Sequence, residues 1–318
     1  MTAEKTSATG LIYDDIFLEH DTDGHPENAE RLRAIRRRLL ETGLWDRMRH
    51  VPARPATLDE LCEVHARSYV RRIDELCKAG GGRPDGDTVL SPRSCDAALA
   101  AAGGCIEAGK AVMAGTVRNA FCAVRPPGHH ALANSTMGFC VFNNVAILAK
   151  YLQRSEKVTH VLIVDWDIHH GNGTQEAFYD DPTVFFFSMH GFPMFPGTGT
   201  KQEIGIGPGS AHTLNIPIYP GTDRAEYMET FEHHIREIGR RFSPQIILIS
   251  AGFDTWKDDP IGGLGLELED YTTLTTLVME LAQQKCGGRI VSVLEGGYDL
   301  RGLALSVENH LLALMGEA

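Results

Sequence analysis

The chain has 318 residues, of which 43% are hydrophobic, and this length is sufficient for one large hydrophobic core. Its formal net charge of −12 at pH 7 argues against broad binding of nucleic-acid phosphates and favours cationic partners. There is no uncharged run of 18 apolar residues and no apolar block near the start, so we expect a cytoplasmic protein with no membrane partner. The seven cysteines contain no Cys-x-x-Cys pair, and we expect their thiols to be reduced.

Short apolar runs alternate with longer helical patterns along the whole chain. Such alternation predicts an α/β fold of three layers (α/β/α), in which helices cover both faces of a central, mostly parallel sheet. We interpret residues 1–318 as a single catalytic domain and expect residues 1–9 to form a flexible leader. In chain order, the patterns predict strands at 10–13, 120–124, 161–164, 184–187, 246–250 and 290–294, and helices at 29–42, 68–78, 95–114, 144–152, 224–241, 268–284 and 300–315.

Residues able to do chemistry follow five of the predicted strands. In open α/β sheets ligands bind at the carboxyl ends of the strands, so we expect these five segments to meet at one edge of the sheet. The segments are 125–130 (Arg-Pro-Pro-Gly-His-His), 165–173 (Asp-Trp-Asp-Ile-His-His-Gly-Asn-Gly), 188–190 (Ser-Met-His), 251–254 (Ala-Gly-Phe-Asp) and 295–298 (Glu-Gly-Gly-Tyr).

The second segment has the composition of a metal site. Alternate side chains of a strand share a face, so Asp167 and His169 are expected to point the same way, about 6–7 Å apart along the chain. Such ligands suit zinc, which in catalytic sites needs a third protein ligand and an open position. Asp254 follows a fully apolar predicted strand, where a buried carboxylate needs a compensating charge. We therefore predict Asp254 as the third ligand, although its Gly-Phe-Asp-Thr context, taken alone, also fits a turn cap.

A pair of adjacent histidines, His129 and His130, follows the tripeptide Pro-Pro-Gly at 126–128. The two prolines restrict the backbone, and the glycine is free to adopt unusual angles. A rigid turn of this kind at a strand end can present both imidazoles to one substrate.

Together these segments resemble the zinc-dependent deacetylases of the histone deacetylase family, which have an arginase-like α/β fold. The resemblance covers nearly the whole chain. Gly-Asn-Gly-Thr-Gln at 171–175 and Glu-Gly-Gly-Tyr at 295–298 are similar to the class II branch and its bacterial relatives, which points to a bacterial source. Further matching motifs are His-Pro-Glu at 25–27, Gly-Phe-Cys at 138–140 and Phe-Pro-Gly-Thr-Gly at 195–199.

The resemblance implies a zinc-dependent amidohydrolase that uses a metal-activated water to remove an acyl group from a long amine. Tyr298 would donate its hydroxyl to the developing oxyanion. His130 would be the general base and acid, and His129 would be its electrostatic partner. One zinc ion would be held by Asp167, His169 and Asp254.

In the family each of the two histidines is supported by a polar residue. By motif position, Asp165 would face His129 and Asn172 would face His130. A carboxylate partner favours the imidazolium and an amide does not, so His129 should hold a proton more readily than His130.

The resemblance also implies a substrate channel. Phe139, which follows Gly138, and Phe195 would form two aromatic walls around an aliphatic stem. Arg31 matches a residue thought to line an exit channel for the released acid, and an arginine on a helix surface fits the same position nearly as well.

Two monovalent ion sites are implied by the same relatives. The first, for potassium near the zinc, would be formed by Asp165, Asp167, His169, Ser188 and the carbonyl of Met189. The second would lie around Phe178, Asp181 and Val184.

The substrate class stays open between two alternatives. Relatives that prefer acetylated polyamines carry a glutamate just after the proline downstream of the last metal ligand, whereas this chain has Ile261 after Pro260. We therefore expect acyl-lysine in proteins or peptides, in a site that Ile261 borders. Asp85 and Asp87 keep acetylated polyamines or other small amides as the alternative, because bacterial polyamine enzymes can use acidic residues of this kind.

Two further function classes are disfavoured by the motifs. A manganese hydrolase of the arginase type would carry more carboxylates in an Asp-x-His-x-Asp pattern, and a non-catalytic acyl-lysine binding module would be expected to lack Tyr298 or a metal ligand. The sequence leaves open the native metal (zinc, ferrous iron or cobalt), the preferred acyl group and the oligomeric state.

Overall fold

The computed structural model describes residues 8–317, and eight strands in this part of the chain form one sheet. The strands are β1 (Thr9–Ile12), β2 (Arg49–His50), β3 (Asn119–Cys122), β4 (Val161–Asp165), β5 (Val184–Gly191), β6 (Thr213–Ile218), β7 (Ile246–Ala251) and β8 (Ile290–Leu294). Their spatial order is β2-β1-β3-β8-β7-β4-β5-β6, and every neighbouring pair is parallel. The predicted parallel α/β fold is confirmed.

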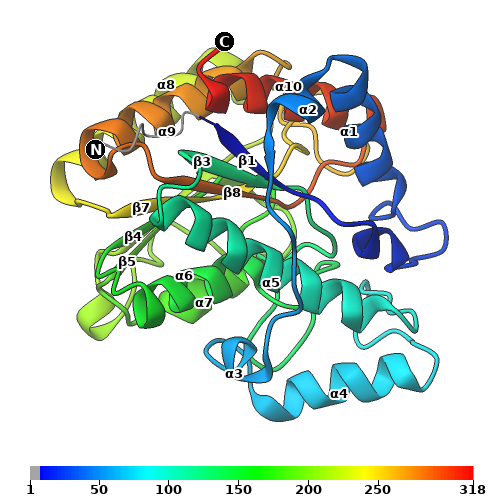
Figure 1. Cartoon of the computed structure of the whole chain (residues 1–318). Coiled ribbons are helices and arrows are strands. Elements are labelled where there is room, and N and C mark those ends of the chain that lie inside the picture. Colours follow the sequence, from blue (N-terminus) through cyan, green and yellow to red (C-terminus); the bar gives the residue numbers. More distant parts are fainter. Residues whose placement is uncertain (1–7, 318) are drawn as a thin grey trace, which may run out of the picture.

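Helices cover both faces of this sheet, as the alternation of patterns predicts. The α-helices are α1 (Glu30–Glu41), α2 (Leu44–Arg47), α3 (Leu58–Leu61), α4 (Arg67–Lys78), α5 (Ser94–Met113), α6 (Asn144–Ser155), α7 (Asn172–Phe178), α8 (Arg224–Arg241), α9 (Asp270–Cys286) and α10 (Leu300–Met315). One face of the sheet carries α5, α6 and α7, and the other carries α1, α8, α9 and α10 (Figure 1). The helices α3 and α4 pack outside α5 and α6.

The central strands are buried on both faces, which explains why their sequences are largely apolar and do not alternate with polar residues. Every residue of β4, β5, β7 and β8 is buried. A strand covered by helices on both sides needs apolar side chains at successive positions instead of alternate ones. Each fully buried Val, Leu or Ile contributes about 1.5–3 kcal/mol to the stability of the fold. The polar residues that follow these strands are therefore attached to the most rigid part of the molecule.

Two strands are missing from the sequence prediction, and both lie at the edges of the sheet. The strand β6 has the sequence Thr-Leu-Asn-Ile-Pro-Ile, in which Asn215 and Pro217 are residue types depleted in strands. Proline is tolerated on an edge strand because an N–H that faces away from the sheet is not needed for its hydrogen bonds. The strand β2 has only two residues, both exposed, and this is too short for a recognisable pattern.

The expected leader needs correction at its end. Thr9 already belongs to β1, where it pairs with Asn119 of β3. Residues 1–7 lie outside the described part of the chain. Within residues 8–317, none of the helices is long and apolar enough to cross a membrane.

Candidate active site

The five polar segments meet at the carboxyl end of the sheet, as the sequence predicts. They follow β3, β4, β7 and β8 or lie in the last part of β5. Because β8, β7 and β4 are neighbours, the segments that follow them are in contact although they are far apart in sequence. The loop after β3 contacts the end of β4. The loop after β4 contacts both the loop after β7 and the loop after β8.

Asp167, His169 and Asp254 form a buried cluster whose ligand atoms all lie within 4.8 Å of one another. His169 Nδ1 is 3.1 Å from Asp167 Oδ1 and 3.3 Å from Asp254 Oδ2. Asp254 Oδ2 is buried and has no hydrogen-bond partner among the described residues. A buried carboxylate oxygen without a partner is costly, and coordination of a metal ion removes that cost. The three residues therefore fit a divalent metal ion with two oxygen ligands and one nitrogen ligand.

The charges of this cluster also favour a cation. Burial raises the pKa of Asp254, and the neighbouring charge of Asp167 raises it further. Burial opposes the ionisation of Asp167 as well, but the adjacent His129 and His169 hold its pKa well below the usual range. A doubly charged cation between the two carboxylates would remove the repulsion that their approach creates.

Two glycines leave the space that the carboxylates occupy. A Cβ atom on Gly296 would lie 2.1 Å from Asp254 Oδ2, and one on Gly252 would lie 2.2 Å from Asp167 Oδ2. No larger residue fits at these distances without displacing a ligand. The N–H of Gly296 also donates to Asp167 Oδ2 over 2.8 Å. Gly296 thus supports the metal ligands and belongs to the loop that carries Tyr298.

His129 and His130 lie side by side, with ring centroids 4.0 Å apart. Each has the partner expected from its motif. His129 Nδ1 donates to Asp165 Oδ2 over 3.0 Å, and His130 Nδ1 donates to Asn172 Oδ1 over 2.8 Å. Asn172 is the first residue of α7, a helix that the sequence prediction did not include.

The two histidines differ in protonation. Burial lowers the pKa of His129, but the charges of Asp165 and Asp167 outweigh burial and raise the pKa to about 10. For His130, burial and the positive charges of His129 and His169 lower the pKa well below its ordinary value. At neutral pH His129 is therefore charged, and His130 is neutral with its Nε2 free of a proton.

Tyr298, Phe139 and Phe195 are partly exposed and lie on the solvent side of the site. Phe139 packs edge to face against Tyr298, with ring centroids 5.9 Å apart, and Phe195 packs in the same way against His130 at 5.1 Å. Gly138 has a φ of +55°, and a Cβ atom on it would lie 2.4 Å from His130 Cδ2. The two phenylalanines thus contact different residues of the site, Phe139 the Tyr298 ring and Phe195 the His130 ring.

Arg31 is fully buried, so its interpretation as an arginine on a helix surface is wrong. Its Nε donates to the carbonyl oxygen of Gly297 over 2.7 Å, and its Nη2 donates to that of Glu295 over 2.5 Å. Glu27 accepts from Nη1 over 3.1 Å and also pairs with the buried Arg125. The guanidinium carbon lies 5.1 Å from the centre of the Tyr298 ring. The sequence signal was the spacing of Glu27 and Arg31, four residues apart, as in a helical ion pair.

Glu295 has a position that the sequence did not reveal. Its carboxylate accepts the backbone N–H groups of Gly128 over 2.8 Å and His129 over 3.2 Å, and the hydroxyl of Ser250 over 3.2 Å. Burial is the main reason that the pKa of Glu295 is raised to about 7. Glu295 therefore ties the loop of the histidine pair to the ends of β8 and β7.

The residues expected to bind potassium also lie together. Ser188 lies inside β5 and directly opposite Asp165, because β5 continues beyond its predicted end to Gly191. Asp165 Oδ1 accepts the N–H of Asp167 over 3.1 Å. Met189 follows Ser188 in the strand and is buried.

A cationic side chain already lies at the expected second monovalent site. Lys150 Nζ is 2.9 Å from Asp181 Oδ2 and 4.7 Å from the centre of the Phe178 ring. The ammonium group supplies the positive charge that the Asp181 carboxylate attracts. The geometry therefore disfavours a further cation at this position.

Hydrogen bonds from two buried histidines hold the loop that carries Phe195. His170 Nδ1 and the Thr198 hydroxyl are hydrogen-bonded at 2.8 Å, and His190 Nε2 donates to the carbonyl oxygen of Gly199 over 2.9 Å. Burial lowers the pKa of His170 to about 3 and that of His190 to about 4, so both rings are neutral. These histidines thus have a structural task next to the site, in contrast to His129 and His130.

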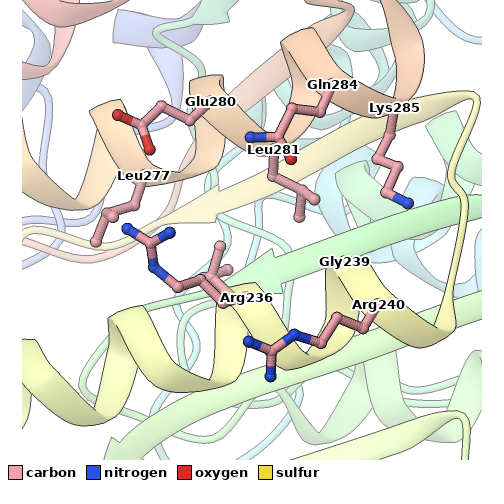
Figure 2. Close-up of a pocket in the computed structure, with 9 residues that line it drawn as sticks. Arg236, Gly239, Arg240, Leu277, Glu280, Leu281, Gln284 and Lys285 are labelled. Atoms are coloured by element: carbon pink, nitrogen blue, oxygen red, sulfur yellow. The ribbon is translucent and has the colours of Figure 1, made fainter.

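A hollow of about 220 Å³ between α8 and α9 shares no residue with this site (Figure 2). Its arginines Arg236 and Arg240 form ion pairs along α8 with Glu232 and Glu237. None of the potential metal-binding clusters of residues 8–317 lies in it. We assign no chemistry to this hollow, which is lined by Ile235, Arg236, Gly239, Arg240, Leu277, Glu280, Leu281, Gln284 and Lys285.

Comparison with known proteins agrees with the geometry of the site. Residues 25–314 match the family model described as histone deacetylase domain. A "probable deacetylase" of Archaeoglobus fulgidus is 42% identical over an alignment of 310 residues that covers 96% of this chain and 86% of that protein. Human histone deacetylase 9 is 36% identical over 98% of this chain, which spans 34% of that protein. Human histone deacetylase 7 is 37% identical over 97% of this chain, which spans 36% of that protein.

A solved structure is similar along nearly the whole chain. The crystal structure of the HDA15 HD domain has a TM-score of 0.93 and 35% sequence identity, over 98% of this chain and 90% of that one. Its agreement with the eight-stranded sheet described above extends the match from sequence to fold. The chain therefore belongs to the histone deacetylase domain family.

Proposed function

We propose that the protein is a zinc-dependent deacylase that hydrolyses acyl-lysine side chains in proteins or peptides. The observation that carries the proposal is the buried Asp254 Oδ2, which accepts no hydrogen bond from residues 8–317, in a cluster with Asp167 and His169 and beside one charged and one neutral histidine. The relatives, which are named as deacetylases, support the reaction class. A potassium ion between β4 and β5 is part of the proposal as a structural ion.

His130 has the protonation state that a general base needs. A zinc ion held by Asp167, His169 and Asp254 would supply Lewis-acid activation of the attacking water and of the amide carbonyl. Because His130 donates its Nδ1 proton to Asn172, its Nε2 can take a proton from the water. The same nitrogen can then return that proton to the leaving amine, so the enzyme ends the reaction in the state in which it began.

His129 and Tyr298 stabilise charge. His129 is held positive by Asp165 and stays so while His130 gains and loses its proton. Burial raises the pKa of Tyr298 well above its ordinary value, so its hydroxyl remains a donor at neutral pH. A hydroxyl donor directed at the carbonyl oxygen stabilises the negative charge that develops there.

The substrate preference follows from the partly exposed residues around the site. Phe139 and Phe195 offer apolar faces that suit the methylene stem of a lysine side chain. Ile261 is half-buried and uncharged, so it gives no attraction to a second positive charge on a polyamine. This combination supports acyl-lysine as the substrate.

Acetylated polyamines are the second candidate, since two carboxylates lie beside Gly138. Asp87 Oδ1 accepts the N–H of Gly138 over 3.1 Å, and Asp85 accepts the hydroxyl of Thr136. Burial raises the pKa of Asp87, and the neighbouring Asp85 raises it further. A cationic substrate group near this pair would relieve that repulsion.

A competition assay tests both proposals. Zinc-loaded enzyme receives an equimolar mixture of acyl-lysine peptides and acetylated polyamines, each product is followed by mass spectrometry, and a chelated sample is the control. We expect preferential loss of the peptide acyl group. The acyl-lysine assignment would be overturned if the enzyme preferred polyamines and if Asp87→Asn lowered polyamine turnover more than peptide turnover. Absence of metal-dependent turnover on every substrate would contradict the hydrolase itself.

Replacing Asp165 by asparagine is expected to raise the pH at which activity is lost on the acid side. Asp165 favours the charged form of His129, and that charge lowers the pKa of His130. Without the carboxylate His129 loses its proton more easily, so the pKa of His130 rises toward its ordinary value of 6.5. The free base is then protonated at a higher pH than in the wild type. Profiles of kcat/KM against pH measure the shift.

The matched control for this prediction is Asp258→Asn, which makes the same change at an exposed position. It should leave the acid limb of the profile in place. An acid limb that stays unmoved in Asp165→Asn as well would argue against the division of labour between the two histidines.

A further inference from the structure

We propose that Asp259 is a positioning residue that sets the direction of the Tyr298 side chain by holding the backbone of its loop. The inference rests on the function proposed above, in which the Tyr298 hydroxyl donates to the developing oxyanion. Asp259 is 8% exposed and lies in the loop after β7, and Tyr298 lies in the loop after β8. In the sequence, Asp-Asp-Pro at 258–260 has only the composition of a turn.

The carboxylate of Asp259 accepts four backbone N–H groups from two separate segments. Oδ1 accepts from Ile261 over 3.0 Å and from Gly262 over 3.1 Å. Oδ2 accepts from Tyr298 over 2.7 Å and from Asp299 over 3.1 Å. The first two contacts are those of a local turn. The contacts with Tyr298 and Asp299 come from residues 39 and 40 positions away, so a role of Asp259 in stabilising the turn at 259–262 does not account for them.

The peptide group between Gly297 and Tyr298 is held on both sides by charged side chains. Its N–H donates to Asp259 Oδ2, and its carbonyl oxygen accepts from Arg31 Nε over 2.7 Å. Hydrogen bonds to ionised groups are shorter and roughly twice as strong as those between neutral groups. The N–H of Asp299, on the other side of the Tyr298 Cα, donates to the same Oδ2, so the backbone is held before and after Tyr298 and the direction of its Cα–Cβ bond is restricted.

The sequence around Tyr298 explains why such a hold is needed. Gly296 and Gly297 precede it, and Gly297 has a φ of +115°, a conformation that side chains rarely adopt. Two glycines give the backbone more freedom than any other pair, and Gly296 has to be glycine because of the metal ligands. The loop cannot be stiffened by its own residues, so rigidity has to come from side chains elsewhere.

A double-mutant cycle tests the inference, with Asp259→Asn, Tyr298→Phe and the double variant compared with the wild type. Asparagine has one carbonyl oxygen, so two of the four N–H groups would face an amide NH2 group. We expect Asp259→Asn to lower kcat by about 10- to 100-fold, because small displacements of a reacting group have effects of that size. In the Tyr298→Phe background the same change should lower kcat by less than about twofold, since the hydroxyl that it misplaces is already gone.

Two measurements separate this role from a general loss of structure. Zinc content should stay unchanged in Asp259→Asn, and Asp258→Asn, the exposed neighbour, should keep wild-type kcat. Equal losses from Asp259→Asn in both backgrounds, or no loss in either, would overturn the inference. If Asp259→Asn does not fold, Asp259→Glu, which keeps the charge but lengthens the side chain, is carried through the same cycle with the same criteria.

The cycle also distinguishes failure of this inference from failure of the proposed function. Wild-type turnover that is unchanged in Tyr298→Phe would remove the oxyanion role of Tyr298, and the positioning role of Asp259 with it. If Tyr298→Phe lowers kcat strongly and Asp259→Asn lowers kcat by the same factor in both backgrounds, only the positioning role of Asp259 is removed.

Discussion

Replacing Asp254 by asparagine is expected to abolish stoichiometric zinc binding and to lower kcat/KM by well over 100-fold. Losing a residue that merely supports a metal ligand typically costs about 10- to 100-fold, and loss of a ligand should exceed this. Asparagine can still accept the N–H of Ile168, which donates to Asp254 Oδ1 over 2.9 Å, so the loop is retained. What disappears is the charge of the unpartnered Oδ2. Metal analysis of the purified variant, with steady-state kinetics, measures both effects.

The stability of the same variant makes the test more specific. Because burial and the charge of Asp167 raise the pKa of Asp254 from its ordinary 3.8 to about 7, its charged form opposes folding, and the contribution of Asp254 to the stability of the metal-free wild type should fall as the pH rises through this range. Asp254→Asn removes this penalty, so the metal-free variant should unfold at a higher temperature than the metal-free wild type at pH 7. Zinc at 100 times its Kd should stabilise the wild type by about 2.7 kcal/mol, and the variant by nothing.

Asp258→Asn is the matched control for these measurements, because it makes the same chemical change in the exposed part of the same loop. It should bind one zinc ion and retain its turnover. Zinc binding by Asp254→Asn with wild-type affinity would refute the assignment of the third ligand.

Replacing Tyr298 by phenylalanine is expected to lower kcat by about 10²- to 10³-fold with a small change in KM. Removal of one donor to a developing oxyanion has an effect of this size, and it appears mainly in kcat because the charge develops only in the transition state. The phenyl ring keeps the edge-to-face contact with Phe139, so the packing of the loop is preserved. Steady-state kinetics on the better substrate of the competition assay give the two constants separately.

Two outcomes would contradict this expectation in different ways. Unchanged turnover in Tyr298→Phe would show that the oxyanion is stabilised by another group. A wild type that binds acyl-lysine peptides, for example by fluorescence anisotropy, but turns none over would favour the non-catalytic binding module. Zinc content equal to that of the wild type is the control, since the proposed zinc ligands are Asp167, His169 and Asp254.

The parts of the fold that could be predicted from sequence are those whose patterns are local. The runs at β4, β7 and β8 are apolar at successive positions because each strand is covered on both faces, and such runs are visible without knowledge of neighbours. Polar residues that directly follow these runs have to lie at the carboxyl end of the sheet. Asp167, His169 and Asp254 were therefore accessible from sequence as one cluster.

The parts that could not be predicted depend on contacts between distant segments. Arg31 sits in a helix with other arginines, and only its contact with the loop of Gly297 shows that it is buried. Lys150 gives no sign in the sequence that it reaches Asp181. The edge strand β6 has no local pattern of its own and exists because β5 offers it a partner.

The fold class and the candidate site residues could be predicted from the sequence, because apolar runs and the polar motifs that follow them are local patterns of the chain. How the reactive groups are held and charged became visible in the three-dimensional arrangement. The protonation of His129 and His130 depends on charges from three different loops, and the direction of Tyr298 depends on Arg31 and Asp259, which lie far from it in sequence. Electrostatic and hydrogen-bond energies depend on distances in space, and the packing of the sheet sets those distances.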